Sequence, residues 1–327
     1  MSYSLASFYR AIGTSKQSVH QRIKRSKLLM EHIEYLELIV QQVRRHHPQM
    51  ALRTIHEKIV DCRIGRDRFE QEFKKRGYGI VRVVKPSRTT DSRGVSKFDN
   101  LAKDVELNHI NQLWVSDITY FELEGKFYYL TFIMDIYSRR IVGHAVSDRL
   151  LTRCTTLPAL KTALKLRGFA PSNQPKNLII HSDGGGQYYS DEFQSLTKAH
   201  GLRNSMAENV YENPHAERVN GIIKNNYLQH WTIQSFEQLV KSVDRAVSLY
   251  NHEKPHKALR KSTPVYFENG LIYFAEQQKS EGDKLIDGKL KKKGASSPIS
   301  SWQQKSSGSK SISGKPILIR KQTVNAI

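Results

Sequence analysis

The sequence predicts an α/β core that follows an all-α region and precedes a disordered, basic tail. Three strand-like stretches joined by tight turns, and then alternating helices and strands, predict the core over residues 110–276. Amphipathic helical patterns fill residues 1–83, and a stretch of fading periodicity over 84–109 reads as a linker. Residues 277–327 are rich in Ser, Gly and Lys and carry few apolar side chains, so this tail is expected to be disordered.

Residues 4–26 predict two short helices around a turn. LASFYRAI supplies an apolar face, Gly13 ends it, and Ser15 is placed to cap SKQSVHQRIKR. This pair is a candidate helix-turn-helix, although short helical pairs are common in proteins without that function. Its second helix would present a polar recognition surface made of Lys16, Gln17, His20, Gln21 and Lys24.

A longer helix is predicted over residues 28–46, where apolar side chains recur at steps of four and three. The spacing fits a coiled-coil seam, but it is short, and we favour the core of a helical domain. The members of this stripe are Leu29, Ile33, Leu36, Val40 and Val43. His47-Pro48 ends the helix, and ALRTIHEKIVD and RDRFEQEFKKRG form a second helix-turn-helix candidate, with Arg66 and Arg68 as candidate DNA contacts.

The core begins with a hairpin. QLWVSDITYFEL and KFYYLTFIMDIYS are joined by Glu124-Gly125 and lead into a third strand, RRIVGHAVSD. A helix, the buried strand NLIIHSD, a second helix and the short strand LRNSM follow, and helices at about 213–229 and 233–251 complete the unit. Three antiparallel strands and then alternating helix and strand indicate a ribonuclease-H-like α/β core.

The charge is distributed unevenly along the chain. The net charge of +21 divides into +11 for residues 1–100, +2 for residues 101–276 and +8 for residues 277–327. Basic flanks around a nearly neutral core indicate a polyanionic partner, with double-stranded DNA favoured. Two cysteines exclude a disulfide framework, and no signal core or membrane-length apolar run is present, so a cytoplasmic protein without a membrane partner is expected.

Three acidic residues stand out as candidate catalytic side chains. Asp117 lies within an apolar strand, Asp183 ends another strand before a triple glycine, and Glu217 lies on a polar helix. Each has a plain structural alternative: a satisfied buried carboxylate, a turn residue and a solvated helical Glu. As an ordered trio, however, they supply the oxygen ligands with which two divalent metal ions catalyse phosphoryl transfer.

The motifs WVSDITY, HSDGGGQY, AERVNGIIK and YNHEKPHKAL…TP resemble those of the integrase-core (DDE-type, retroviral-integrase-like) transposases of bacterial insertion sequences, nearest to the insertion-sequence-three family. The resemblance runs from about Arg53 to Tyr266. It implies that Asp117, Asp183 and Glu217 are the catalytic residues and the ligands of two Mg²⁺ ions, or of Mn²⁺, and that Lys224 contacts DNA. The spacing between Asp183 and Glu217 is two residues shorter than the family usually has.

The resemblance also implies an activity and its partners. These are cleavage at the inverted repeats that end a mobile element, followed by attack of the freed 3′-hydroxyl on target DNA, by a homo-oligomer associated with the bacterial nucleoid. A non-catalytic DNA-binding descendant and a nuclease acting on RNA–DNA hybrids are the competing hypotheses.

Glu208 and Glu212 compete with Glu217 for the third acidic position. Lys224 lies seven residues after Glu217, about 20° from the same helix face, whereas Glu212 lies about 140° from it. Because Pro214 suits the first turn of a helix, Glu212 should lie at or outside the start of that helix.

Overall fold

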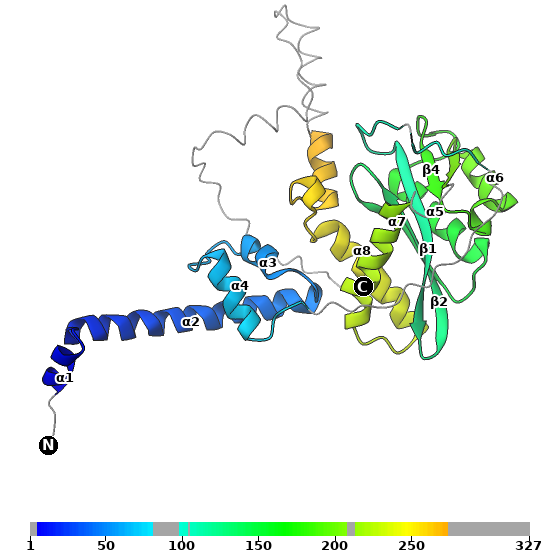
Figure 1. Ribbon diagram of the computed structural model, residues 1–327. Helices are drawn as coiled ribbons and strands as arrows, with labels where there is room; N and C mark the ends of the chain where they lie inside the picture. Colours follow the sequence, from blue (N-terminus) through cyan, green and yellow to red (C-terminus); the bar gives the residue numbers. More distant parts are fainter. Residues whose placement is uncertain (1–4, 81–97, 104, 208–212, 274–327) are drawn as a thin grey trace, which may run out of the picture. The chain divides into compact units, whose positions relative to one another are not determined.

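The computed structural model describes residues 5–80, 98–103, 105–207 and 213–273, which belong to two compact units divided after Val84 (Figure 1). The disorder expected of residues 277–327 and the first part of the expected linker therefore lie outside the described residues. No helix within the described ranges is both long enough and apolar enough to cross a membrane.

The first unit is entirely helical. It contains α1 (Leu5–Ala11), α2 (Lys16–His46), α3 (Leu52–Lys58) and α4 (Arg66–Lys75). The Ser15 side chain caps α2 by accepting a hydrogen bond from the backbone N–H of Ser18 at 3.1 Å, as predicted. The separate helices expected over 15–25 and 28–46 are one continuous helix, because no Gly or Pro interrupts the sequence between them.

The core of this unit lies between the second half of α2 and the α3–α4 pair. The apolar stripe of α2 faces this core, so the helical-domain interpretation is correct. The fully buried side chains include Leu36, Val40, Ile55, Phe69 and Phe73.

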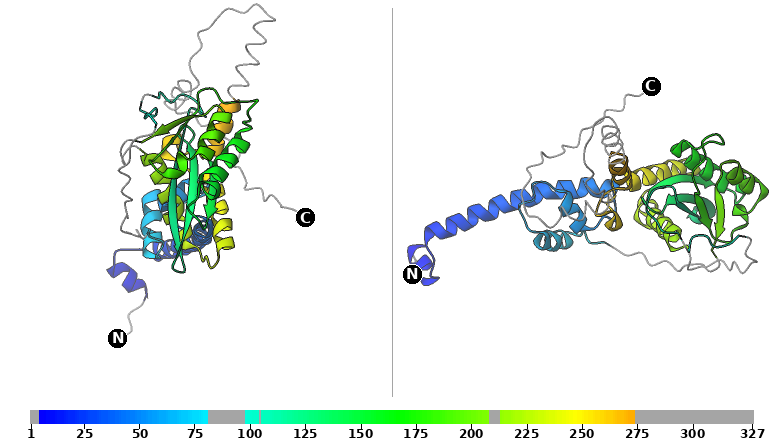
Figure 2. Two further views of the ribbon diagram at one scale, coloured as in Figure 1. Left: turned by 90° about the vertical axis from the view of Figure 1, so that its right-hand side faces the viewer. Right: turned by 90° about the horizontal axis from the view of Figure 1, so that it is seen from above.

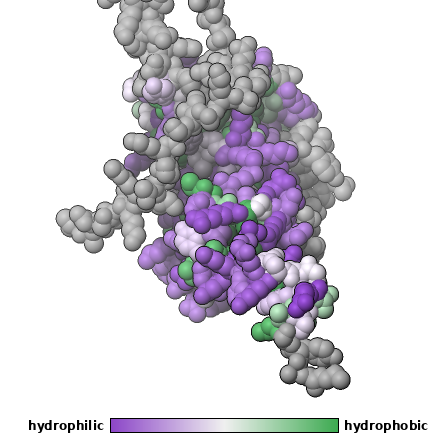
Figure 3. All heavy atoms as spheres, turned by 90° about the vertical axis from the view of Figure 1, so that its left-hand side faces the viewer, coloured by the Kyte–Doolittle hydropathy of each residue, from purple (hydrophilic) through white to green (hydrophobic). Residues whose placement is uncertain are grey.

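The first helix-turn-helix candidate lacks such a core in the described structure. Neither α1 nor the first half of α2 contributes a buried residue. Large apolar side chains are exposed there instead, at Leu5, Phe8, Ile12 and Ile23. Figure 3 shows a face that is largely hydrophilic, with hydrophobic residues scattered over it.

The second unit is built on a five-stranded sheet with the strand order β3-β2-β1-β4-β5. The strands are β1 (Leu113–Leu123), β2 (Lys126–Asp135), β3 (Ile141–Ser147), β4 (Ile179–Ser182) and β5 (Arg203–Met206). β1, β2 and β3 pair antiparallel, whereas β4 pairs parallel to both β1 and β5. Glu124 and Gly125 both have positive φ, as a tight two-residue hairpin turn requires.

Helices cover both faces of the sheet (Figure 2). α5 (Thr156–Arg167) and α6 (Asp191–Ala199) pack with Trp114 and Ile180, whereas α7 (Pro214–Asn226) and α8 (Phe236–His252) pack with Leu113 and Val115. Alternate residues of β1 therefore face opposite helical layers. This is the ribonuclease-H-like arrangement that the sequence predicts.

The last part of the expected linker packs on this unit. Leu101, Val105 and Leu107 contact the α7–α8 side of the core, and the backbone N–H of Leu101 donates to Ser205 Oγ at 2.9 Å. Apolar side chains at these positions explain why the segment docks.

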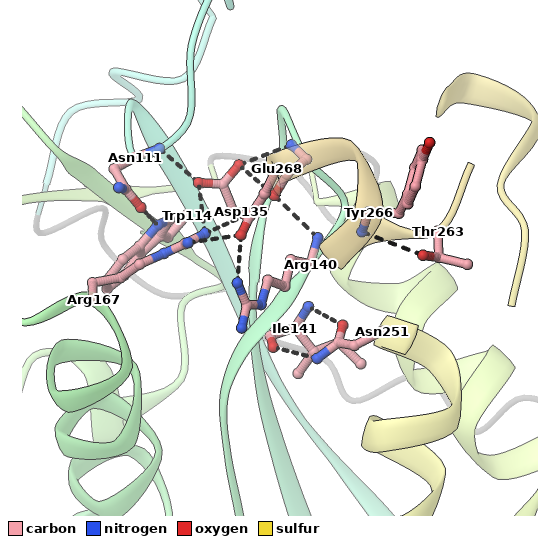
Figure 4. A network of polar contacts seen from close by, with 11 residues as sticks. Asn111, Trp114, Asp135, Arg140, Ile141, Arg167, Asn251, Thr263, Tyr266 and Glu268 are labelled. Atoms are coloured by element: carbon pink, nitrogen blue, oxygen red, sulfur yellow. Dashed lines mark hydrogen bonds and ion pairs between the residues drawn. The ribbon is translucent and has the colours of Figure 1, made fainter. Parts of the chain in front are cut away.

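A buried ion-pair network ties the last described helical residues, 264–273, to the sheet (Figure 4). The guanidinium of Arg167 donates to both carboxylate oxygens of Glu268, at 2.9 and 2.6 Å, and Arg140 donates to the same carboxylate. Asp135 lies 3.7 Å from Arg167 and accepts hydrogen bonds from the backbone of Asn111 and Ser138. Burial would raise the pKa of Glu268, but the two arginines outweigh it and lower that pKa.

Gly143 of β3 should tolerate no side chain. A Cβ there would lie 2.2 Å from the carbonyl oxygen of Ala159 and 2.9 Å from Ala163 Cβ, both on α5. Gly143→Ala should therefore lower the free energy of unfolding by about 1–3 kcal/mol, measured by denaturant titration. Gly270→Ala is the control because a Cβ there meets nothing within 4 Å, and an equal loss in both variants would contradict the packing described.

Candidate active site

Strand register brings Asp117 and Asp183 together. The last pair between the parallel strands β1 and β4 is Ser116 with Ser182; Asp117 is the next residue of β1, and Asp183 is the first residue after β4. Neighbouring strands lie about 4.8 Å apart, so the two carboxylates leave the sheet side by side. Asp117 shares the face of Leu113 and Val115, which is the face covered by α7.

One face of α7 covers these carboxylates. Asn220 Nδ2 donates to Asp117 Oδ2 at 2.7 Å, and Lys224 Nζ donates to Thr119 Oγ1 at 2.7 Å. Glu217 precedes Asn220 by three residues and Lys224 by seven, which places all three on one face of the helix. The Glu217 side chain is exposed, and its charge acts on Asp117.

The start of α7 is fastened to β1 beside Asp117. Asn213, the residue before the helix, donates from Nδ2 to the backbone oxygen of Ser116 at 3.0 Å, and Pro214 occupies the first helical turn, as predicted. Glu208 and Glu212 lie outside the described residues.

A buried tyrosine supports the carboxylates from the other face of the sheet. The hydroxyl groups of Tyr188 and Ser116 are 2.8 Å apart, and Ser116 also donates to the backbone oxygen of Phe132. Burial raises the pKa of Tyr188 well above its ordinary value, and the charges of Asp183 and Asp117 raise it further. Tyr188 therefore stays a neutral hydrogen-bonding group.

Asp183 is held by the glycine turn that follows it. Its Oδ1 accepts a hydrogen bond from the backbone N–H of Gly185 at 3.2 Å, and Tyr189 donates to the backbone oxygen of Gly184 at 2.9 Å. A Cβ at Gly184 would lie 2.8 Å from Cε at the flexible end of the Met206 side chain.

The electrostatics of the carboxylates favour a cationic ligand. Burial raises the pKa of Asp117 to about 7, and the charges of Asp183 and Glu217 add to the effect. Burial also raises the pKa of Asp183. Carboxylate oxygens are ligands that hard divalent cations prefer, so the donor chemistry fits such an ion. However, no group of three acidic, His or Cys side chains in the described ranges is gathered closely enough to form a metal site.

The other predicted site residues lie in the first unit. Lys16, Gln17, His20, Gln21 and Lys24 are all exposed along α2, and Arg66 and Arg68 are exposed on α4. These residues and the carboxylates therefore belong to different units.

Sequence reasoning missed Asn220, Tyr188 and Asn213. Asn220 had a usable signal, because it lies three residues after Glu217 and four before Lys224, on the face that those residues define. Tyr188 and Asn213 had none, since their roles depend on the packing of distant strands.

Two models of the integrase core domain match this chain, one over residues 108–210 and the other over residues 202–264. Together the two matches span residues 108–264. Asp117 and Asp183 lie in the first match, and Glu217 and Lys224 lie in the second.

Insertion-sequence proteins are similar to the chain over and beyond this integrase core. The 31 kDa protein of insertion element IS600 from Shigella sonnei is 31% identical over 160 residues, which are 48% of this chain and 57% of the relative. Transposase InsF of IS3 from Escherichia coli K12 is 29% identical over 250 residues, 70% of this chain and 84% of the relative. The chain thus spans a little over half of the first relative, and the predicted resemblance to insertion-sequence transposases is confirmed.

Among solved structures, the integrase core is similar to the catalytic core domain of HTLV-2 integrase, which was solved in complex with magnesium. The TM-score is 0.39 at 23% identity, and the match covers 48% of this chain and 95% of that one.

Asp117→Asn should raise the melting temperature of the metal-free protein at about pH 8 but not near pH 4. The pKa of Asp117 in the folded protein, about 7, exceeds its ordinary value of 3.8. The folded protein therefore retains a proton that the unfolded chain releases, and stability falls as pH rises through this window, by about 1.4 kcal/mol per pKa unit. Because asparagine carries no charge, Asp117→Asn removes this loss of stability at high pH.

Melting curves in EDTA across this pH range measure the effect. The exposed Asp148 provides the control, Asp148→Asn. Parallel pH profiles for wild type and Asp117→Asn would contradict the raised pKa of Asp117.

Proposed function

We propose that this chain is the DNA transposase of an insertion sequence, and that Asp117, Asp183 and Glu217 are its catalytic carboxylates. The observation that carries the proposal is the register of β1 and β4, which sets two partly buried aspartates side by side beneath the Glu217 face of α7. The integrase core matches support the same assignment.

The three carboxylates would hold magnesium ions, two in the proposed mechanism, with manganese as a substitute. When bound, these ions would stabilise the charge that develops on the attacking and leaving oxygens of an in-line phosphoryl transfer. Glu217 is exposed, which leaves its side chain room to turn toward the aspartates.

Neighbouring side chains position the aspartates and the DNA. Asn220 orients Asp117 through its 2.7 Å hydrogen bond. Lys224, now held by Thr119 and 5.3 Å from the centre of the Tyr120 ring, would exchange the Thr119 hydroxyl for a DNA phosphate. The three glycines at 184–186 have no side chains, so none of them would stand between Asp183 and an approaching DNA backbone.

The proposed reaction has two steps, hydrolysis of one phosphodiester and then a transesterification. Water first cleaves the strand at the element end and leaves a 3′-hydroxyl. That hydroxyl then attacks a phosphodiester of the target, forming one P–O ester bond as another breaks. Energy from ATP is not needed, because the number of ester bonds is conserved in the second step.

The helical unit would bind the inverted repeats of the element. Arg66 and Arg68 on the packed α3–α4 pair, and the exposed polar face of α2 with Lys16, Gln17, His20, Gln21 and Lys24, are the proposed contacts. Pairing of two element ends would require a homo-oligomer, acting on nucleoid DNA in the cytoplasm.

A substrate comparison tests the function against its alternatives. The purified chain is incubated with Mg²⁺ or EDTA and with three labelled duplexes: DNA carrying the repeats that flank the gene, random DNA, and an RNA–DNA hybrid. We expect Mg²⁺-dependent nicking and joining of the repeat-bearing DNA. Cleavage of the hybrid alone would favour a nuclease, and binding without any nicking would favour a non-catalytic DNA-binding protein.

A further inference from the structure

Five basic residues from three separate segments gather around the start of α7, on a different face from Glu217. We call them the basic cluster: Arg139, His215, Arg218, Lys254 and His256. Arg139, in the turn between β2 and β3, donates from Nη1 to His215 Nδ1 at 2.6 Å. The charge of Arg218 lowers the pKa of each of the other four members, so each of them lies within electrostatic range of Arg218.

Within the part of the chain that the structure describes, the cations of this cluster have no carboxylate partner. Within the described residues, neither Arg139, Arg218 nor Lys254 forms an ion pair with a carboxylate. The carboxylate whose charge acts on Arg139 is that of Asp135, which is already engaged by Arg167 and two backbone N–H groups. Burial lowers the pKa of Arg139 and of Lys254, and the charge of Arg218 lowers both further. The free protein therefore holds mutually repelling cations.

Lys254 and His256 belong to the motif YNHEKPHKAL, in which Asn251 has a structural role. The Asn251 amide bonds both the backbone N–H and the backbone oxygen of Ile141 at 2.9 Å (Figure 4). The His256 ring packs on Tyr250 at 4.6 Å, but its Nε2 is buried and has no hydrogen-bond partner. The fold therefore accounts for Asn251 and leaves the charge of Lys254 and the Nε2 of His256 unused.

We propose that the basic cluster binds a phosphate of the DNA backbone. Guanidinium and ammonium groups are the usual phosphate ligands, and the cluster is a local concentration of positive charge in a region whose net charge is only +2. An anion would offset the repulsion among the cations, whereas His256, whose pKa burial lowers to about 3, stays neutral. The inference rests on the proposed function, which makes DNA the substrate.

The geometry separates this phosphate from the reacting one. Glu217, Asn220 and Lys224 face β1, whereas Arg218 lies about 100° further around α7. The phosphate in the basic cluster would therefore lie at the start of α7, and it would hold a DNA strand in place without touching the carboxylates.

The salt dependence of DNA binding tests the proposal. Arg218→Gln/Lys254→Gln is compared with wild type and with Lys161→Gln/Lys165→Gln, a charge-matched control on the exposed side of α5. The dissociation constant for a random DNA duplex is measured over a range of salt concentrations. We expect the slope of log affinity against log salt to fall by about 0.9 in the cluster variant, for one lost phosphate contact, and to stay unchanged in the control. Equal slopes in the two variants would overturn the proposal.

Melting temperature without DNA distinguishes a binding role from a structural one. The cluster variant should melt at or above the wild-type temperature, because it lacks the repulsion. A lower melting temperature with an unchanged salt slope would assign a purely structural role and overturn the proposal. Stabilisation of wild type by inorganic phosphate, together with an unchanged DNA slope, would indicate a site for free anions and would also overturn it.

Failure of the proposed function would be recognised separately. A wild-type chain that never nicks DNA would remove the transposase assignment, yet the difference in salt slope would still be measurable.

Discussion

Replacing either aspartate with asparagine should abolish DNA cleavage, lowering its rate by about 10³-fold or more, because the variants lose the charge that would bind the metal ions. Asp117→Asn and Asp183→Asn keep the shape of each side chain, and the asparagine oxygen at position 117 can still accept the hydrogen bond of Asn220. Folding and DNA binding should therefore persist. Single-turnover cleavage of a repeat-bearing duplex measures the effect.

The control for this experiment is another carboxylate of the same strand. Glu122 lies on β1 but is exposed beyond the site, so Glu122→Gln should retain wild-type cleavage. Substantial cleavage by Asp117→Asn or Asp183→Asn would show that the paired aspartates are not the catalytic centre.

Glu268→Gln should lower the free energy of unfolding by about 3–5 kcal/mol, because it leaves two largely buried arginines without their shared countercharge. Glu268 is 1% exposed and is the common partner of Arg140 and Arg167. Chemical denaturation measures the loss, and protease cleavage after residue 263 should accelerate because the network fixes the helical residues 264–273.

An exposed pair provides the comparison for the buried network. Asp148 and Lys126 are 3.9 Å apart with about half of each side chain exposed, so Asp148→Asn should cost less than about 1 kcal/mol. Similar losses for Glu268→Gln and Asp148→Asn would mean that the network contributes no more than a surface ion pair.

Local sequence signals predicted most of the elements but not all of their boundaries. Ser15 predicted the start of α2, and Glu124-Gly125 predicted the β1–β2 hairpin, because caps and tight turns are determined by a few neighbouring residues. The break expected within residues 26–27 was wrong, since polar residues without Gly or Pro do not end a helix.

The candidate site was predictable where it depended on periodicity. Helical spacing placed Glu217 and Lys224 on one face, and the structure confirms that Lys224 reaches β1 on that face. The adjacency of Asp117 and Asp183 depends on strand register across a long chain separation, which the sequence pattern alone does not determine. The basic cluster was missed for the same reason, because its members come from three segments that only the fold brings together.

The identity of the third catalytic carboxylate can be tested most directly. We propose that it is Glu217, which lies on the same face of α7 as Asn220 and Lys224, the two residues that contact β1. Mg²⁺-dependent cleavage of a repeat-bearing duplex is compared for wild type, Glu217→Gln and Glu212→Gln. We expect Glu217→Gln to lose cleavage while retaining DNA binding, and Glu212→Gln to cleave at nearly the wild-type rate. Cleavage that survives Glu217→Gln but is lost in Glu212→Gln would contradict the proposed site.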